Sequence, residues 1–414
     1  MPSMTTENNH QTFYGLGIAP AILETLERMK FKTPTPIQHK AIPIANEGKD
    51  MLGIAQTGTG KTLAFGIPMV QRLAQHLTAK AVVLVPTREL AVQVDETLRK
   101  VCQPYNIRTA ILIGGMNMGT QIQTVRKSVT RIYIATPGRF MDHIQQKTVS
   151  LQDIKMVVLD EADRMLDMGF APQIERIMRN MPKDRQTLLF SATMPEAILK
   201  IATVYMKLPI RIEMARSGTA AEKIIQEIFI VRQESKRQLL IKLLQQYQGS
   251  VLVFARTKMG AAKITRALRD MHFTAAEIHS DRSLGQRREA LEGFKLGRYR
   301  VLIATDIASR GIDVKGIELV VNYDLPEDSE NYIHRIGRTG RAGHEGRAIS
   351  LATPDQGSNV RDIEKLMRTT LTISTHPDIP GESFSRFTGN AGNARPRPAA
   401  GFRRRFRSTA RHIR

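Results

Sequence analysis

Residues 55–62 read AQTGTGKT, and they stand between the apolar run Met51–Ala55 and a segment of helical periodicity. A strand, a glycine-rich turn and a helix start in this order bind phosphate, because backbone N–H groups and the helix N-terminus converge on phosphate oxygens. Gly58 and Gly60 let the backbone approach closely, Lys61 would reach the β- and γ-phosphates, and Thr62 would ligate Mg²⁺. The stretch begins with alanine where the usual pattern has glycine. The alternative is an ordinary Gly/Thr-rich turn, which the flanking strand and helix disfavour.

A group of carboxylates further along the chain supports a nucleotide site. Asp160, Glu161 and Asp163 directly follow the apolar run Met156–Leu159, and the carboxyl ends of parallel strands face the crevice where open α/β sheets bind ligands. Asp160 suits a Mg²⁺ contact, commonly through water, and Glu161 is placed to polarise an attacking water. Acids after a strand are by themselves usually a solvated loop, so this interpretation depends on the upstream phosphate loop.

Short apolar runs alternate with longer helical segments through most of the chain. Repeated strand–helix units predict parallel sheets with right-handed crossovers, and two series of such units predict two α/β domains. We expect an N-terminal segment over 1–20, a first domain over 21–208, a linker over 209–222 and a second domain over 223–380. The predicted strands are Met51–Ala55, Ala81–Val85, Thr109–Ile113, Arg131–Ala135, Met156–Leu159, Thr187–Phe190, Val251–Phe254, Ala275–Ile278, Val301–Ala304, Leu319–Asn322 and Ala348–Leu351.

The composition is that of a folded protein with a polyanionic partner. Of the 414 residues, 42% are hydrophobic and 24% are charged, and Lys and Arg outnumber Asp and Glu by 61 to 39, which gives a net charge of +22. Such an excess suits nucleic acid or an anionic membrane surface. The single cysteine cannot form an internal disulfide, so a reducing compartment fits best. No apolar run approaches the length of a membrane span, so membrane proteins and secreted disulfide scaffolds are excluded.

The C-terminal segment differs from the rest of the chain. Residues 381–414 contain nine Arg, no Lys and one acid, Glu382, which gives a net charge of +8. A segment with so few apolar groups cannot offset its ordering entropy, so we expect a disordered basic tail. Such a tail would hold nucleic acid through phosphate attraction that weakens as salt rises. A solubilising charged end is the alternative.

Ten motifs in fixed order make the sequence resemble a DEAD-box RNA helicase over residues 13–351. The resemblance implies two tandem RecA-like domains, each a parallel sheet flanked by helices, with ATP and Mg²⁺ as cofactors. The short second domain and the basic tail are most similar to the bacterial RhlE-like branch. Besides residues 55–62 and 160–163, the motifs are Pro34-Thr35-Pro36-Ile37-Gln38, Pro86-Thr87-Arg88-Glu89-Leu90, Gly114-Gly115, Thr136-Pro137-Gly138-Arg139, Ser191-Ala192-Thr193, Val253–Thr257, Ala304-Thr305-Asp306 with Arg310-Gly311-Ile312-Asp313, and the run from His334 to Arg341.

The resemblance implies a role for each residue of the ATP site. Gln38 reads the adenine edge and Phe31 packs on the ring, with Phe13 in support, whereas Lys30 stands where the family usually has glycine. Arg338 and Arg341 act as arginine fingers on the γ-phosphate, and Asp313 contacts the ribose. The implied catalytic residues are Lys61, Glu161, Arg338 and Arg341, the implied metal-binding residues are Thr62 and Asp160, and the implied nucleotide-binding residues are Phe31, Gln38, Thr57, Gly58, Thr59, Gly60, Lys61, Thr62 and Asp313.

The resemblance also implies coupling and RNA-binding residues. His334 couples closure of the domains to Asp163, Ser191 and Thr193. Small residues and arginines suit contacts with the sugar–phosphate backbone, which carry no sequence information. Ser280 and Arg282 differ from the residues usual before the helix Arg287–Phe294, so details of RNA contact should be altered. The implied RNA-binding residues are Pro86, Arg88, Gly115, Thr136, Arg139 and Thr305.

The expected function is that of an ATP-dependent RNA helicase that couples ATP hydrolysis to domain closure. It would separate short RNA duplexes locally or remodel RNA–protein complexes, as a cytoplasmic monomer with no membrane contact. Its expected partners are RNA and ribonucleoprotein or ribosome-assembly factors. One alternative is an RNA chaperone or clamp that anneals strands and uses its ATPase as a timer. A DNA translocase or a P-loop transport ATPase is disfavoured by the Gln38 motif and by Ser191-Ala192-Thr193.

Overall fold

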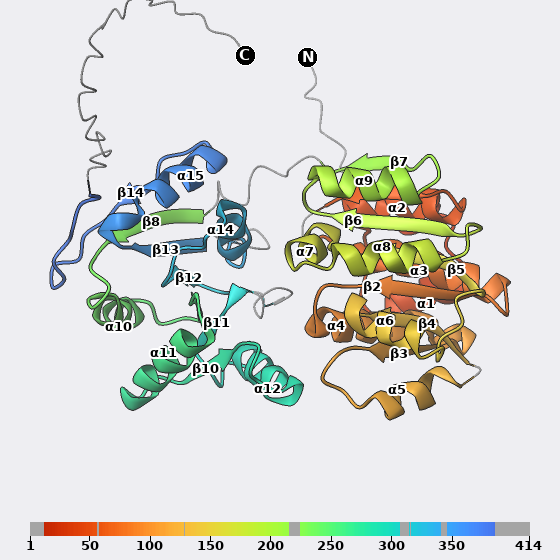
Figure 1. The fold of residues 1–414 in the computed structure, drawn as a ribbon, viewed down its shortest axis with the longest axis horizontal. Coiled ribbons are helices and arrows are strands. Elements are labelled where there is room, and N and C mark those ends of the chain that lie inside the picture. The colour runs from red at the N-terminus through yellow and green to blue at the C-terminus, as the bar shows by residue number, and fades with distance from the viewer. Residues whose placement is uncertain are drawn as a thin grey trace, which may run out of the picture.

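The computed structural model shows two domains side by side (Figure 1). Helices α12 (Leu284–Lys295) and α14 (Ser329–Ile336) of the second domain lie on the side that faces the first domain. Among the helices that the structure describes, none is both long enough and apolar enough to cross a membrane. The structure describes residues 12–55, 58–127, 129–214, 224–306, 314, 316–340 and 346–385, so three predicted site residues, Thr57, Asp313 and Arg341, lie outside it.

The first domain is built on a seven-stranded parallel sheet of order β3-β4-β2-β5-β6-β1-β7. Nearly every residue of its central strands is buried, as strands covered on both faces should be. The first six strands contain the six strands predicted for this domain, with ends shifted by a residue or two. The strands are β1 (Met51–Ile54), β2 (Lys80–Leu84), β3 (Arg108–Leu112), β4 (Thr130–Ala135), β5 (Ile154–Leu159), β6 (Gln186–Ser191) and β7 (Ile210–Glu213).

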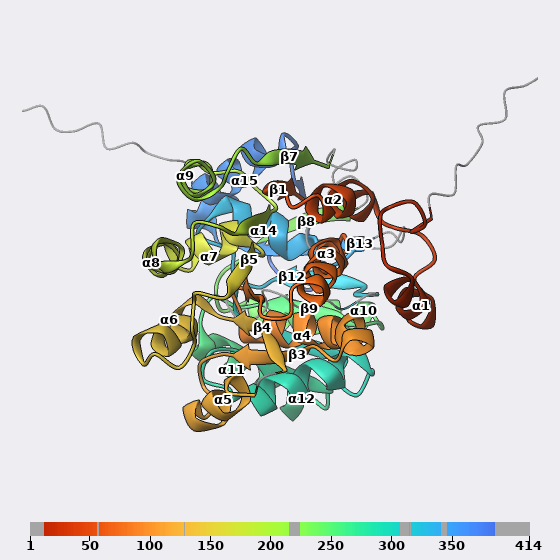
Figure 2. The ribbon, with the colours of Figure 1, turned by 90° about the vertical axis from the view of Figure 1, so that its right-hand side faces the viewer.

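Helices cover both faces of this sheet. Figure 2 shows α2, α3 and α4 on one side of the sheet and α6, α8 and α9 on the other. Each layer encloses its own apolar core, because alternate residues of a strand point to opposite faces. The helices are α1 (Pro20–Arg28), α2 (Pro36–Asn46), α3 (Lys61–Gln75), α4 (Arg88–Cys102), α5 (Met118–Val125), α6 (Pro137–Gln145), α7 (Ala162–Asp167), α8 (Ala171–Asn180) and α9 (Glu196–Tyr205).

The second domain repeats this architecture. Its seven-stranded parallel sheet has the order β10-β11-β9-β12-β13-β8-β14, so each strand has a counterpart at the same place in the first sheet. The strands are β8 (Ile224–Ile230), β9 (Val251–Phe254), β10 (Ala275–Ile278), β11 (Val301–Ala304), β12 (Leu319–Asn322), β13 (Gly346–Ala352) and β14 (Thr372–Ile373). Besides α12 and α14, its described helices are α10 (Lys236–Gln246), α11 (Lys258–Asp270) and α15 (Gly357–Met367). The two predicted RecA-like sheets are thereby confirmed.

Both predicted domain ends differ from the structure. Strand β7 pairs with β1 inside the segment 209–222 that we expected to be linker; its exposed Arg211 and Glu213 form an ion pair, which hides the strand from an apolar pattern. Residues 381–385, expected to belong to the tail, pack on the second domain. Phe384 lies against Gly357 at the start of α15, and the Ser385 N–H donates to the Pro354 carbonyl at 2.8 Å. The expectation of disorder over 386–414 lies outside the described residues.

Candidate functional site

The loop between β1 and α3 has the backbone of a phosphate-binding loop. Gly58 and Gly60 have φ of +85° and +88°, values that side chains other than glycine rarely adopt. Gly60 is the N-cap of α3, so free N–H groups of the first helical turn face the loop. Lys61 is 6% exposed, and its Nζ donates to the Ala55 carbonyl at 3.1 Å. Thr62 follows in the same turn and is partly buried.

The predicted adenine-reading residue also supports this loop. Gln38 is buried, and its Nε2 donates to the Gly60 carbonyl at 2.9 Å. Its Oε1 accepts from the Thr35 N–H at 2.9 Å, which forms a capping box at the start of α2. A side chain at position 60 would collide with the Gln38 amide. The amide therefore ties the helix α2 to the phosphate loop, and its remaining donor and acceptor sites stay available for a base.

An apolar pocket of about 570 Å³ lies beside the predicted adenine position. Phe31 is 41% exposed and lines this pocket with the buried Phe13, as a ring that receives a flat ligand should. Lys30, immediately before Phe31, has φ +64°. Its N–H and that of Phe31 close α1 by bonding to Glu27 and Leu26 carbonyls, a Schellman arrangement in which this position favours glycine. Lys30, which stands where the family usually has glycine, thus adopts the left-handed backbone conformation that the turn requires.

Asp160 is a fully enclosed carboxylate at the end of β5. It is 2% exposed, and its Oδ1 lies 3.9 Å from Lys61 Nζ and accepts the Glu161 N–H at 3.0 Å. Burial raises the pKa of Asp160 to about 6, although Lys61 acts in the opposite direction. A buried carboxylate of this kind is stabilised by a cation, so the residues present fit a hard divalent ion such as Mg²⁺. No group of three or more potential metal ligands occurs among the described residues.

Glu161 is ionised more readily than its neighbour. It occupies a left-handed conformation, φ +53°, as the N-cap of α7. Burial alone would raise its pKa, but the charges of Arg164, Lys61 and Arg338 outweigh burial and lower it to about 2. The carboxylate pairs directly with Arg164 Nη1. Sequence reasoning missed Arg164, although its place three residues after Glu161 at a helix start is a usable signal.

Asp163 connects the carboxylate motif to the next strand. Its Oδ2 accepts the N–H groups of Ala192 at 2.9 Å and Thr193 at 2.8 Å, and the Thr193 hydroxyl at 3.0 Å. The Asp163 N–H in turn donates to Ser191 Oγ at 3.3 Å. The structure thus brings together the three first-domain residues predicted to couple closure.

The second domain contributes Arg338, two residues after the end of α14, to this centre. Arg338 is 5% exposed and its Nε donates to the His334 carbonyl at 3.2 Å. Its charge lowers the pKa of Glu161 across the domain boundary. Arg338 and the first-domain carboxylates therefore belong to one electrostatic centre. The coupling role predicted for the His334 side chain stays a prediction.

A buried ion pair joins the domains at a second place. Arg287 Nη2 on α12 lies 2.9 Å from Glu89 Oε2 on α4, and both residues are 7% exposed. Leu284, at the start of α12, packs against the core of the first domain. Neither charged residue was predicted as functional. A matching pair in distant segments has no sequence signature without knowledge of the fold.

The ends of β9, β11 and β12 are held together by an arginine of α14. Arg335 pairs with both carboxylate oxygens of Asp306 at 2.6 and 2.7 Å, donates to Asn322 Oδ1 at 3.2 Å, and stacks over Phe254. Thr305, a predicted RNA contact, precedes Asp306 and its N–H donates to the Ile278 carbonyl. Arg335 therefore holds Asp306, which follows β11 directly after Thr305.

Predicted RNA-binding residues of the first domain gather around one loop. Gly115 has φ +79°, and a side chain there would collide with the Arg88 guanidinium. Arg139 Nη1 donates to the Met116 carbonyl at 3.0 Å, and the Thr136 N–H donates to the Leu112 carbonyl at 3.1 Å. Arg88, Thr136 and Arg139 are partly exposed, whereas Pro86 is buried. Only the backbone or a ring edge of Pro86 could therefore touch an RNA strand.

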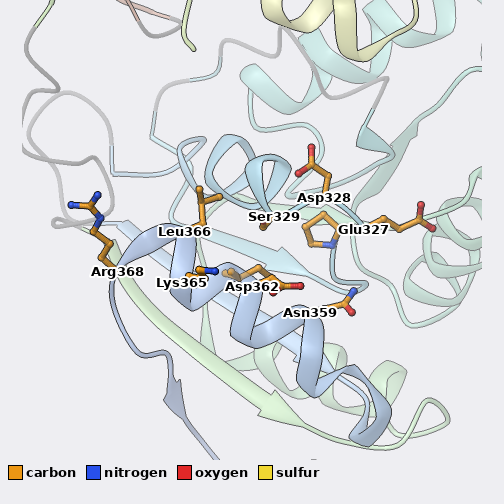
Figure 3. A pocket seen from close by; sticks show the side chains of 10 residues that line it. Glu327, Asp328, Ser329, Asn359, Asp362, Lys365, Leu366 and Arg368 are labelled. Carbon is orange, nitrogen blue, oxygen red and sulfur yellow. The ribbon is translucent and has the colours of Figure 1, made fainter. Parts of the chain in front are cut away.

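A groove of about 570 Å³ lies between α14 and α15 on the second domain (Figure 3). Its lining combines the acids Glu327, Asp328 and Asp362 with Lys365 and Arg368. None of the predicted ATP or RNA residues lines it. It is therefore a surface distinct from the centre around Asp160.

Two parallel RecA-like domains, with a phosphate loop and paired carboxylates on one and an arginine from the other, define a P-loop nucleoside triphosphatase of two domains. The chain matches the family model "DEAD/DEAH box helicase" over residues 35–201 and the model "Helicase conserved C-terminal domain" over 235–343. It belongs to the DEAD-box family of ATP-dependent RNA helicases.

Relatives and a solved structure agree with this assignment. The ATP-dependent RNA helicase CshA of Listeria monocytogenes is 44% identical over 85% of this chain and 68% of the relative. The ATP-dependent rRNA helicase RRP3 of Yarrowia lipolytica is 42% identical over 84% and 73%. The structure of S. cerevisiae Dbp5 bound to RNA and ADP BeF3 is 32% identical, has a TM-score of 0.79, and covers 88% of this chain and 95% of that one.

Proposed function

We propose that this chain hydrolyses ATP between its two domains and uses closure of the domains to separate short RNA duplexes or remodel RNA–protein complexes. The observation that carries the proposal is that Glu161 of the first domain and Arg338 of the second domain are both buried, and that the charge of Arg338 is among those that lower the pKa of Glu161. A planar cation from one domain beside a carboxylate of the other forms a centre that is complete only when the domains are closed. We place the domains at 21–214 and 224–385, with a linker between them.

The proposed ATP site uses the phosphate loop, Gln38 and Phe31 from the first domain. Lys61 neutralises charge on the β- and γ-phosphates, and Arg338 neutralises charge that develops on the transferred phosphoryl group. Thr59 and the glycines line the phosphates. Thr57, Asp313 and Arg341 complete this proposed site by resemblance alone.

The proposed metal is Mg²⁺, held by Asp160 and Thr62. It would supply Lewis-acid stabilisation of the phosphate charge. Ionised Asp160 offers oxygen ligands, and Thr62 lies in the first turn of α3, where its hydroxyl can face the phosphates. Because burial disfavours the Asp160 charge, binding of a cation relieves a cost that the free protein carries.

Glu161 has the properties of an orienting carboxylate. With a pKa lowered to about 2, it remains ionised at neutral pH and is too weak a base to remove a proton early in the reaction. We assign to it the orientation of the attacking water through an accepted hydrogen bond. Asp163, Ser191, Thr193 and His334 would transmit closure to this centre.

The proposed RNA path runs over Arg88, Gly115, Thr136 and Arg139 of the first domain and Thr305 of the second, with Pro86 beneath. Two facts support it: Arg88, Thr136 and Arg139 of the first domain lie around the Gly115 loop, and the similar Dbp5 structure is described as bound to RNA. Domain closure then couples the binding of ATP to the binding of RNA, because each ligand binds the closed state better than the open state. The Glu89–Arg287 ion pair adds to that state.

The wider assignments are also proposals. We place the protein in the cytoplasm as a monomer that acts on RNA and ribonucleoprotein or ribosome-assembly complexes. The short second domain and the Arg-rich C-terminal segment favour the RhlE-like branch, although the relatives described above carry the names CshA and RRP3. Residues 386–414 would tether RNA through phosphate contacts. Removing them should weaken RNA affinity and flatten its salt dependence, and an unchanged salt slope would contradict the tether.

A strand-separation assay tests the proposal against the annealing alternative. A short RNA duplex is incubated with ATP and Mg²⁺, using the wild-type protein, Glu161→Gln and Asp362→Asn as a control in the groove of Figure 3. We expect separation by the wild type and the control, and none by Glu161→Gln. Annealing that survives Glu161→Gln without any separation by the wild type would favour the chaperone function.

A further inference from the structure

His143 lies behind the Gly115 loop and takes part in a buried hydrogen-bond chain. It is fully buried on α6, one helical turn after Arg139. Its Nδ1 lies 2.7 Å from Thr148 Oγ1, and its Nε2 lies 3.3 Å from Gln121 Oε1 on α5. A buried histidine with a partner on each ring nitrogen has a fixed ring orientation.

The contacts of Gln121 determine which atoms donate and which accept in this hydrogen-bond chain. Its Nε2 donates to the carbonyls of Ile113 at 3.1 Å and Met116 at 3.4 Å, which turns its Oε1 toward the histidine. Because Oε1 can only accept, the proton of the neutral His143 ring sits on Nε2 and leaves Nδ1 as an acceptor. The single proton of the Thr148 hydroxyl is shared between Nδ1 at 2.7 Å and the His143 carbonyl at 3.1 Å. Burial lowers the pKa of His143, and the charge of Arg139 lowers it further. The neutral ring therefore has the one donor and one acceptor that its partners require.

The hydrogen-bond chain from Thr148 through His143 and Gln121 ends at the loop that carries Gly114 and Gly115. The carbonyls that accept from Gln121 belong to the residues on either side of the glycine pair. The Met116 carbonyl also accepts Arg139 Nη1 at 3.0 Å. Helix α6 thus holds the loop twice, directly through Arg139 and indirectly through His143 and Gln121.

We propose that His143 is a positioning residue that sets the Gly114–Met116 loop for RNA through Gln121 without touching RNA itself. The inference rests on the proposed RNA path, since it explains why that loop keeps one conformation. Without the histidine, Gln121 Oε1 would be left buried and unpaired. The amide would then be free to turn, and its two bonds to the loop would be lost together.

The test measures KM for single-stranded RNA and KM for ATP in RNA-stimulated ATP turnover. His143→Leu removes the donor at similar size, whereas His143→Gln keeps a donor at the position of Nε2. We expect His143→Leu to raise the RNA KM about tenfold, the effect of one unsatisfied buried polar group. The ATP KM should stay within about twofold, and His143→Gln should restore most of the RNA KM.

Four further variants separate positioning from loss of stability. Gln186→Met is the matched control, since Gln186 is a buried amide of the same domain that bonds to the Ala45 and Lys49 carbonyls. It should lower stability without changing the RNA KM. Gln121→Met alone and combined with His143→Leu should give equal RNA KM values, because a residue that acts through Gln121 adds nothing once Gln121 is gone. If His143→Leu does not fold, Thr148→Val tests the chain from its other end and should raise the RNA KM by a smaller factor.

Several outcomes would overturn the inference. They are an unchanged RNA KM in His143→Leu, equal rises of the RNA and ATP KM, or additive effects of the Gln121 and His143 substitutions. Arg139→Ala separates this failure from failure of the RNA path. If Arg139→Ala weakens RNA binding and the histidine variants do not, only the positioning role is wrong. If Arg139→Ala has no effect either, the RNA path itself is misplaced.

Discussion

Lys61 and Lys236 occupy equivalent places in the two domains and have different surroundings. Each is the first residue of the helix that follows an equivalent strand, β1 or β8. Each ammonium group approaches a carboxylate that follows a second pair of equivalent strands, β5 and β12: Asp160 lies at 3.9 Å and Asp324 at 3.5 Å. Lys61 is 6% exposed and Lys236 is 1% exposed. The fold therefore produces a buried lysine–aspartate pair twice.

The loops before the two lysines explain why only one pair can serve a nucleotide. Gly58 and Gly60 open the first loop, whereas residues 231–235 read VRQES and contain no glycine. Lys236 Nζ also donates to the Tyr323 carbonyl at 2.9 Å and lies over the Tyr323 ring. The second lysine therefore has two polar partners and an aromatic ring within its own domain. The comparison teaches that glycine in the loop, more than the lysine–aspartate pair, makes a phosphate site.

The largest effect is expected from a substitution that breaks the Lys61–Asp160 pair. Lys61→Ala should lower kcat/KM for ATP at least about 100-fold, since a positioned cation on the transferred phosphoryl group contributes on that scale. Steady-state ATP turnover checks this prediction, and unchanged thermal unfolding would show that the fold is intact. Near wild-type turnover would mean that Lys61 does not face the phosphates.

Breaking the Lys236–Asp324 pair should lower the stability of the second domain and leave ATP hydrolysis unchanged. Lys236→Met leaves Asp324 without its cation and should destabilise the second domain by about 3 kcal/mol, while the ATP KM stays unchanged. Cys102 provides the domain-specific measurement, because it is the single cysteine and lies in the first domain. Burial raises the pKa of its thiol to about 12, so it should resist alkylation at pH 8 until the first domain opens.

In Lys236→Met, the unfolding transition should therefore move to lower temperature while Cys102 remains protected below the transition of the first domain. Early labelling of Cys102 would show that the two domains unfold as one unit. A lowered kcat without loss of stability would give Lys236 a part in turnover and contradict the comparison.

A smaller effect is expected where the two domains meet away from ATP. Glu89→Gln removes one charge of the pair with Arg287 and should raise the RNA KM about tenfold, because closure loses a buried charge-assisted contact. ATP binding in the absence of RNA, measured by fluorescence of a labelled nucleotide, should change little. If Glu89→Gln weakened only ATP binding, Glu89 would not contribute to the domain closure that RNA favours, and the prediction would be wrong.

The smallest effect concerns the loop before Phe31. Lys30 holds φ +64° at the end of α1, so Lys30→Gly should stabilise the first domain by about 0.5–1 kcal/mol. Chemical denaturation followed by Cys102 labelling measures this gain. A loss of stability would show that the lysine side chain contributes more than its backbone strain costs.

Sequence reasoning was most successful where a pattern is local. All eleven predicted strands are present, because buried parallel strands read as continuous apolar runs. Strands β7, β8 and β14 were missed, since their exposed residues interrupt the apolar pattern. At the site, the carboxylates and the phosphate loop follow strands directly and could be predicted. Arg287 and His143 contact partners in other segments of the chain, and no spacing rule connects each residue with its partner.

The most direct test of the central claim is ATP turnover by the wild-type protein alone, with single-stranded RNA and with DNA of the same sequence. If ATP and RNA are bound together by a cleft that closes, RNA should stimulate turnover strongly and DNA should do so weakly. Equal stimulation by both nucleic acids would contradict the account, and so would rapid turnover that neither one changes.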